Sequence, residues 1–438
     1  EYPLRGLEET HWLDLFRNYG VKTQTPTEDS YLCQIARYFD GHPLILKMIA
    51  GDINKPVFSG SVTKYWQNYY SQQTRPKIHQ SQEQRARNWV NQTLQQLPPL
   101  ALQMLQHCSV FRRPVPESFY LAMGMSVRAF CQTPLRDDEP LTATLNTLKS
   151  RYLVEEKDIQ NGEIILQLHN LIRDAAYTQL KADHPTWSAA ERQAADLWLT
   201  TYQPAPDAPN LETVRGELEA FDHYCEVEDW QQAKTILLDQ QIGLRLQTWG
   251  KYQEMIIAHQ RLVGCLQTTD EVACTKGLGN AYYFLSNYSL AIASYEKSLN
   301  LAKEIGDRSG QWKALNNLGN VYQNLGDYPK SIEYLQQTLT ISREIGDRQG
   351  EGNALGNLGN VYYSLGNYEQ AIDFHQQNLT IAREIGDHRG EGNALGNLGS
   401  AYDSLSNYEQ AIDFHQQSLT ITREIGDRKG EGNALGNL

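Results

Sequence analysis

The stretch ALGNLGNVYYSLGNYEQAIDFHQQNLTIAREIGDHRG, residues 354–390, decides the fold of this chain. Closely similar stretches lie before and after it at a constant spacing of forty residues, marked by four glycines in equivalent settings: Gly279, Gly319, Gly359 and Gly399. A fixed period of this length is the sequence signature of repeat architectures, in which one supersecondary unit is stacked several times.

Each unit carries two stripes of residues at helical spacing. The first stripe consists of Leu355, Leu358, Tyr362 and Leu365. The second follows a turn at Gly366-Asn367 and consists of Ala371, Phe374, Asn378, Ala382 and Ile385. Residues three and four apart lie on one face of a helix, and a Gly-Asn pair is typical of a turn. The unit is therefore predicted to be a helical hairpin.

The spacing within the unit resembles the tetratricopeptide repeat. The matching residues in one unit are Leu315, Leu318, Gly319 and Tyr322, with a small residue twelve positions after the glycine: Ser331, or Ala291, Ala371 and Ala411 in the other units. The link REIGDRxGEGN and the longer second helix are similar to the repeats of kinesin light chains and spindle-orientation adaptors. The small residue late in the second helix is here Ser298, Thr338, Asn378 or Ser418, and the closing proline is absent. The resemblance implies an α-α superhelix of stacked hairpins over residues 276–438.

In tetratricopeptide folds the first helix of each unit lines a concave groove. Carried over by position, that groove displays Lys313, Asn316, Asn320, Gln323, Asn353, Gly356, Asn360, Tyr363, Asn393, Gly396, Ser400 and Asp403. Side-chain amides along a groove suit an extended peptide, because each can donate one hydrogen bond and accept another. We therefore expect a protein or peptide partner there, with a merely solvated helix face as the alternative for any single asparagine.

The N-terminal part combines helical stripes with one hairpin. Stripes in RNWVNQTLQQL, LALQMLQHCSVF and LTATLNTLKSRYL precede the strand LVEEKD, a turn at residues 160–162 and the strand EIILQLH. Helices followed by a two-stranded wing predict a winged helix. The expected class is mainly α, with these domains: 1–80 a helical bundle, 81–183 a winged helix, 184–275 a degenerate helical-repeat adaptor, and 276–438 the repeats.

Two short motifs give the N-terminal part a further resemblance. Gly41-His42-Pro43-Leu44 ends a helical segment, and Leu168-His169-Asn170 joins the wing to the next helix. In this order, before tetratricopeptide repeats, they resemble the regulatory half of a STAND or NB-ARC signal-transducing NTPase. The resemblance implies that Gly41 and Pro43 border the adenine pocket and that His169 lies near the β-phosphate of ADP. His42 replaces the family's leucine, and Asn170 replaces its aspartate, although asparagine should still cap the following helix.

The alternative for His169 is a core histidine with a local hydrogen bond. A catalytic role is the least favoured, because no nucleophile and base stand at a recognisable spacing, and a phosphate-binding loop would lie upstream of Glu1. The chain lacks an initiator methionine, and its last eight residues restart a repeat, so we expect a fragment. Whether the parent protein is an ATPase, and whether it oligomerises on activation, stay open, with ADP or ATP as the expected cofactor only together with an upstream domain.

Composition excludes several classes of function. The formal net charge of −13 disfavours nucleic acid as a partner, since binding to phosphate backbones needs a basic surface. The six cysteines show no metal-ligand spacing, which argues against a metal site. No apolar run is long enough to span a membrane, so a cytoplasmic protein without membrane contact is the expectation.

The leading hypothesis is therefore the regulatory and sensor half of a STAND-type signalling ATPase. One rival is a tetratricopeptide adaptor or scaffold that works without nucleotide. The other is a transcription regulator that reads DNA with the helix LTATLNTLKSRYL, whose region offers only Lys149 and Arg151 as basic groups.

Overall fold

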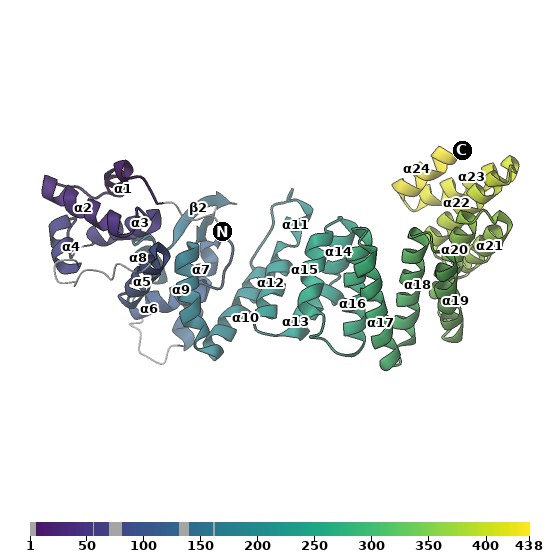
Figure 1. The fold of residues 1–438 in the computed structure, drawn as a ribbon, viewed down its shortest axis with the longest axis horizontal. Coiled ribbons are helices and arrows are strands. Elements are labelled where there is room, and N and C mark those ends of the chain that lie inside the picture. The colour runs from purple at the N-terminus through teal and green to yellow at the C-terminus, as the bar shows by residue number, and fades with distance from the viewer. Residues whose placement is uncertain (1–5, 56, 70–80, 131–139, 161–162) are drawn as a thin grey trace. The chain divides into compact units, whose positions relative to one another are not determined.

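The computed structural model describes residues 6–55, 57–69, 81–130, 140–160 and 163–438. The chain divides into two compact units, Glu1–Glu228 and Asp229–Leu438. Both are built mainly of helices, and the described residues contain one small sheet (Figure 1). The predicted mainly α class is thus confirmed, and the division between the units falls inside the segment 184–275 that was expected to be an adaptor.

The first unit begins with a helical bundle. Its helices are α1 (Trp12–Asn18), α2 (Pro26–Tyr38), α3 (Pro43–Ile53) and α4 (Val62–Tyr69). The hydroxyl of Thr25 caps α2 by accepting a hydrogen bond from the Glu28 N–H, and Pro26 fits the first turn because its missing N–H needs no partner there. Helix α3 is the centre of the bundle, since residues 48–53 are all buried.

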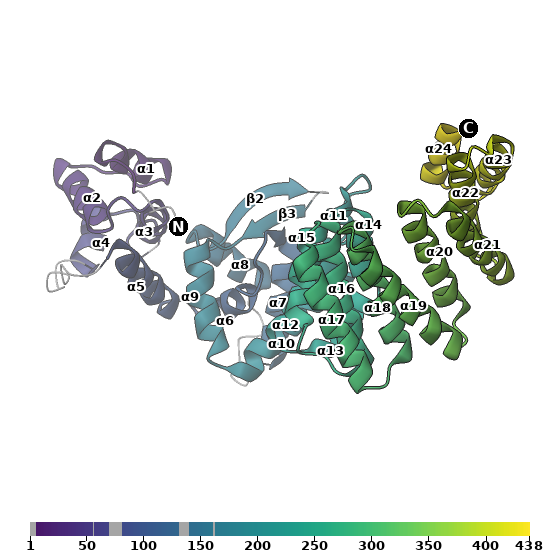
Figure 2. The ribbon, with the colours of Figure 1, turned by 45° about the vertical axis from the view of Figure 1, so that its right-hand side comes forward.

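The bundle is followed by the region predicted to be a winged helix, which contains helices and a small sheet. Its helices are α5 (Gln82–Gln95), α6 (Pro99–Cys108), α7 (Glu117–Phe130) and α8 (Leu141–Ser150). Strands β1 (Val115–Pro116), β2 (Glu155–Gln160) and β3 (Glu163–Gln167) form an antiparallel sheet in the order β1-β3-β2, and Figure 2 shows β2 and β3 side by side. Neither α7 nor β1 was expected from the sequence, and of the predicted turn, residues 161–162 lie outside the described residues.

Helices then complete the first unit and build the second. They are α9 (Asn170–Lys181), α10 (His184–Thr200), α11 (Asn210–Thr213) and α12 (Arg215–Glu226), and in the second unit α13 (Trp230–Lys234), a π-helical turn (Thr235–Asp239), α14 (Ile242–Thr248) and α15 (Tyr252–Leu262). The regular hairpins follow as α16 (Thr268–Phe284) with α17 (Tyr288–Glu304), α18 (Arg308–Asn324) with α19 (Tyr328–Glu344), α20 (Arg348–Ser364) with α21 (Tyr368–Ile385), and α22 (His388–Ser404) with α23 (Tyr408–Glu424), before α24 (Arg428–Asn437).

The repeated link REIGDRxGEGN fixes each passage from one hairpin to the next. Its aspartate is a helix cap: the carboxylate of Asp387, for example, accepts a hydrogen bond of 2.9 Å from the Gly390 N–H. Its arginine and glutamate bond across the link, as Arg383 Nε does to Glu391 Oε1 at 2.7 Å. From the sequence alone, the Gly-Asp pair in this link predicts only a turn. In the structure, its aspartate also determines at which residue the next helix begins.

The glycine at the centre of each unit marks the closest approach of the two helices. A Cβ built on Gly359 would lie 2.5 Å from Cε1 of His375 in α21, and one built on Gly319 would lie 2.7 Å from Cγ of Leu335. Non-bonded carbon atoms do not pack this closely. The glycine is therefore required so that a large side chain of the second helix can fill the hairpin core.

We predict that Gly359→Ala destabilises the repeats by about 1 to 3 kcal/mol, because the added methyl overpacks the hairpin core. Gly432 in α24 is the matched control, since nothing lies within 4 Å of a Cβ built there. Gly432→Ala should instead stabilise by up to about 1 kcal/mol through helix propensity. Urea unfolding followed by circular dichroism measures both, and two changes of the same sign would contradict this packing.

Two of the hairpin cores contain a histidine at the position that Tyr295 and Leu335 occupy in the others. His375 is 1% exposed, and its Nδ1 has no hydrogen-bond partner among the described residues. Burial lowers its pKa from 6.5 to about 4, because a charged imidazole would lose its hydration in the core. The ring is therefore neutral in the folded repeats near pH 7.

The neutral His375 makes the repeats sensitive to acid. Since the folded pKa lies below the ordinary value, the stability is complete above about pH 6.5 and falls as the pH drops towards 4, by up to about 3 kcal/mol. His375→Leu, which copies Leu335, should shrink the loss of unfolding free energy between about pH 7.5 and about pH 5 by about 2 kcal/mol. An unchanged loss in this variant would show that His375 is not the group that titrates.

Candidate functional site

His169 lies at the junction of β3 and α9, half-buried. Its Nδ1 accepts a hydrogen bond of 3.2 Å from the Leu171 N–H, so the neutral ring carries its proton on Nε2. Burial lowers the pKa of His169, and the nearby Glu155 opposes this in part. The residue therefore presents a neutral imidazole with an Nε2–H donor, for which no acceptor appears among the described residues.

The same contact corrects one expectation. Asn170 was expected to cap the helix after the wing, but the cap is His169, and Asn170 is the exposed first residue of α9. The reason is the extended backbone of His169, with φ −61° and ψ 140°, which brings its own Nδ1 to the N–H two residues ahead. A histidine ring nitrogen can accept as a carboxylate does, which the preference for Asp, Asn, Ser and Thr at caps does not anticipate.

The Gly41 to Leu44 motif forms the tight entry to α3. Gly41 has φ +67°, and a Cβ there would lie 2.4 Å from the Leu7 carbonyl oxygen, so only glycine fits. Pro43, half-buried, is the first residue of α3. His42 between them is 3% exposed, and its Nδ1 has no hydrogen-bond partner among the described residues. Burial lowers the pKa of His42, and the neighbouring His169 lowers it further.

The two motifs lie on neighbouring elements, because β2 pairs with β3 through Glu155 and Gln167, two residues before His169, and β2 also contacts α3. Contacts between α3 and the winged helix hold them there: Lys47 Nζ lies 3.8 Å from Glu155 Oε1. Deeper in the fold, Asp52 Oδ1 lies 3.5 Å from Nη2 of Arg151. The half-buried His169 therefore offers an Nε2–H donor that could serve an anionic group, whereas His42 is buried with an Nδ1 that has no partner among the described residues.

Both basic residues near the proposed reading helix are engaged inside the fold. Lys149 of α8 contacts Glu117 at 3.1 Å and Glu156 at 2.9 Å, and the Arg151 side chain is 6% exposed against Asp52. A base-reading helix needs free cationic and polar groups that can reach the groove. The observed pairing gives α8 no such groups at these two positions.

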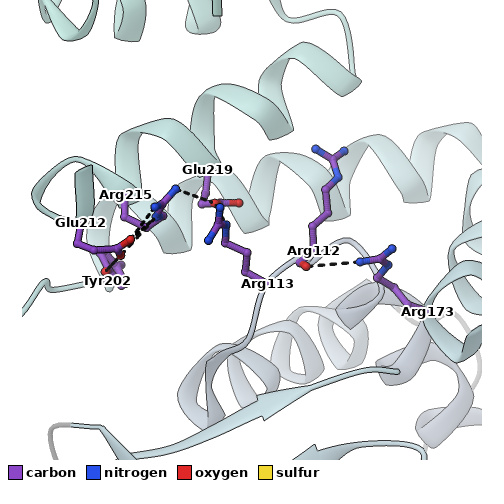
Figure 3. A network of polar contacts seen from close by, with 7 residues as sticks. All are labelled: Arg112, Arg113, Arg173, Tyr202, Glu212, Arg215 and Glu219. Atoms are coloured by element: carbon purple, nitrogen blue, oxygen red, sulfur yellow. Dashed lines mark hydrogen bonds and ion pairs between the residues drawn. The ribbon is translucent and has the colours of Figure 1, made fainter. Parts of the chain in front are cut away.

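A second feature of the first unit is a charged network beside a cavity of about 410 Å³ (Figure 3). Arg113 Nε bonds to Glu219 at 2.7 Å, and Arg215 bonds to Glu212 at 2.6 Å. The cavity is also lined by Trp198 of α10. Since the two arginines and two glutamates pair with one another, the network carries little net charge, and we assign it to holding α12 against the segment before β1.

The predicted groove residues divide into two sets. One cavity of about 270 Å³ between α20, α21 and α22 is lined by four of them: Asn353, Gly356, Asn360 and Asn393. The remaining residues do not line it: Lys313, Asn316, Asn320, Gln323, Tyr363, Gly396, Ser400 and Asp403. Of these, Asn316 accepts a 2.9 Å hydrogen bond from Asn357, and the Tyr363 hydroxyl lies 3.1 Å from the Ser404 hydroxyl.

Four further residues with amide side chains line the cavity and were not predicted to do so: Gln349, Asn357, Asn378 and Asn397. Asn397 donates a 3.2 Å hydrogen bond to Asn360, just as Asn317 donates one of 3.1 Å to Asn280, so amides bridge successive first helices. The partners in these bonds are 37 residues apart, about one helical turn less than the forty-residue repeat. This spacing is the one sequence signal that could have predicted the bridging amides. Asn378 belongs to the second helix of its unit, whereas the predicted groove residues all come from first helices.

The described residues contain no cluster of histidine, cysteine or carboxylate side chains that could hold a metal ion. Within the same residues, no helix has the length and apolar character that crossing a membrane requires.

A model of the tetratricopeptide repeat matches three overlapping stretches, residues 271–344, 311–384 and 350–424. The interpretation of the C-terminal hairpins as tetratricopeptide repeats is thereby confirmed. A search of curated proteins gave no match.

Several solved structures are similar to this chain. A STAND protein with a tetratricopeptide repeat sensor from Pyrococcus horikoshii is 17% identical over 99% of this chain and 63% of its own, with a TM-score of 0.42. This chain thus spans less than two thirds of that protein. A Podospora anserina protein with kinesin-light-chain-type repeats is 17% identical over 44% of this chain and 98% of its own (TM-score 0.37). A Rap protein in complex with Competence and Sporulation Factor is 14% identical over 58% and 76% (TM-score 0.39).

The capping contact of His169 can be tested locally. His169→Ala should lower the protection of the Leu171 amide against hydrogen exchange by roughly fivefold, because the loss of a cap costs about 1 kcal/mol. His169→Asn should retain most of the protection, since asparagine is among the best caps. Equal exchange of this amide in the wild type and in His169→Ala would contradict the contact.

Proposed function

Because residues 271–424 are tetratricopeptide repeats, we propose that this chain is the regulatory and sensor half of a STAND-type signalling ATPase. In this proposal the bundle and the winged helix contact ADP or ATP held by a nucleotide-binding domain outside the chain. The repeats bind a protein or peptide partner. The observation that supports the proposal is the contact between Lys47 of α3 and Glu155 of β2, which links the elements that carry the two motifs of the resemblance.

The residues present at this place suit a nucleotide phosphate. His42 has a buried Nδ1 without a described partner, and His169 has a neutral ring whose Nε2–H is a donor. Lys47 adds a positive charge, shared with Glu155. A bound nucleotide would supply phosphate oxygens, which are strong acceptors for such donors. His169 would contact the β-phosphate of ADP and so stabilise the closed state, and Gly41 and Pro43 would border the adenine base.

The cap and the ligand contact use different nitrogens of His169. Nδ1 stays with the Leu171 N–H, which orients the ring and fixes the tautomer. Nε2–H is then left for the phosphate. Loss of this acceptor on a change of nucleotide state would leave the His169 ring held by the cap of α9 alone, which gives the winged helix a local means of sensing the nucleotide.

The repeats supply the second input. Amides from three helices line one cavity, and an amide can satisfy both the N–H and the C=O of an extended peptide. Binding there would shift the balance between an ADP-closed and an ATP-open state only as far as the partner prefers one of them. Activation would thus require a partner with different affinities for the two states.

We predict that a longer protein, including the upstream nucleotide-binding domain, retains ADP on purification. His169→Ala should weaken this retention by about 1 to 3 kcal/mol, the contribution of one charge-assisted hydrogen bond, measured by isothermal titration with ADP. His169→Asn is the matched control, because it keeps the helix cap but lacks the ring donor. It should weaken ADP as much as the alanine variant does while leaving the start of α9 protected.

Unchanged ADP affinity in both variants would leave the nucleotide-independent adaptor as the better description. An effect of His169→Ala that His169→Asn reverses would assign the histidine to capping alone.

A further inference from the structure

The cavity between α20, α21 and α22 exists because one repeat lacks a side chain that its neighbour has. In the preceding unit the corresponding position holds Trp312, which is 6% exposed and packs against Gly350 of the following helix. In this unit the position is Gly352, and one turn later Gly356 replaces Asn316. The missing indole leaves about 270 Å³ next to Asn378, and a Cβ on Gly356 would lie 2.8 Å from Nδ2 of Asn378.

Asn378 is the unusual residue of this cavity. In two other units the same position carries a serine whose hydroxyl donates to a backbone carbonyl: Ser298 to Val272 at 3.0 Å and Ser418 to Gly392 at 2.8 Å. Within the described part of the chain the Asn378 amide makes no hydrogen bond, and its half-buried side chain lines the cavity. Its donors and its acceptor are therefore not used by the protein, and a ligand that offers a matching acceptor and donor can pair with both.

The walls of the cavity define what can pair with this amide. One wall is apolar and consists of Ile381, Ala382 and Ile385. Asp387 lies at the edge, and its carboxylate already accepts from the Gly390 N–H at 2.9 Å and from Gln349 at 3.2 Å. A second carboxylate would be repelled by Asp387, and a cation would find no unpaired carboxylate to replace its hydration. A purely apolar group would leave the amide of Asn378 unpaired.

We propose that this recess is a subsite for a glutamine side chain of the partner peptide. Its two methylene groups would lie along Ile381 and Ile385, and its carboxamide would exchange two hydrogen bonds with the amide of Asn378. An amide pairs with an amide in both directions, because each offers a donor and an acceptor. The inference rests on the proposed peptide binding by the repeats and adds a determinant of sequence specificity outside the first helices.

The test uses the complete chain labelled with ¹⁵N-asparagine. The side-chain resonances of Asn378 are those that disappear in Asn378→Ser, a replacement that copies Ser418 and should fold, since its hydroxyl can reach the Gly352 carbonyl. The chain is titrated with N-acetylglutamine N-methylamide. The Asn378 resonances should shift saturably, with a dissociation constant in the millimolar range that suits a single-residue ligand. The glutamate and norleucine analogues should bind roughly tenfold more weakly or not at all, a difference of about 1.4 kcal/mol.

Resonances of Asn378 that do not move, or that respond equally to all three compounds, would overturn the proposal. If Asn378→Ser loses helical circular dichroism, Asn378→Asp takes its place in identifying the Asn378 resonances, because it keeps the shape of the side chain and removes its NH₂ group. The probe is a single residue, so its result is independent of whether longer peptides bind the groove. Peptide binding that Asn378→Ser leaves unchanged would remove this subsite but not the proposed function.

Discussion

The close contact between a glycine of the first helix and a large side chain of the second is the constraint on which the repeats depend. Gly359 against His375 and Gly319 against Leu335 show two solutions of the same packing problem. Glycine within a helix costs about 1 kcal/mol relative to alanine. A single hairpin therefore gains too little from its own helices, and the stacking of neighbouring hairpins must supply the difference.

Glycines also shape the two regions that we connect with function. Where Gly352 stands in place of Trp312, the hairpin core is incomplete, and polar side chains from α20, α21 and α22 surround the space that is left. In the first unit, Gly41 allows the chain to turn tightly into α3 directly before the buried His42. In both units, a glycine thus lies near a polar side chain that has no hydrogen-bond partner among the described residues.

The sequence predicted the features that depend on local spacing. The forty-residue period, the hairpins and the winged-helix strands follow from periodicity, and the structure bears them out. It did not predict features that depend on tertiary contact. Strand β1 has only two residues and exists through its pairing with β3, and the capping by His169 depends on a backbone angle. From the sequence, Asn378 occupies the position of a small residue late in the second helix. Its place in a cavity depends on the facing helix, which has Gly352 where the preceding unit has Trp312.

Our central claim is that partner binding at the repeats and nucleotide binding near His169 are coupled. The direct test is the dissociation constant of ADP for a longer protein that includes the nucleotide-binding domain, measured with and without a saturating peptide bound to the repeats. The account predicts that the peptide weakens ADP by about five- to 150-fold and that ADP weakens the peptide by the same factor. An ADP dissociation constant that is the same with the repeats empty and filled would contradict it.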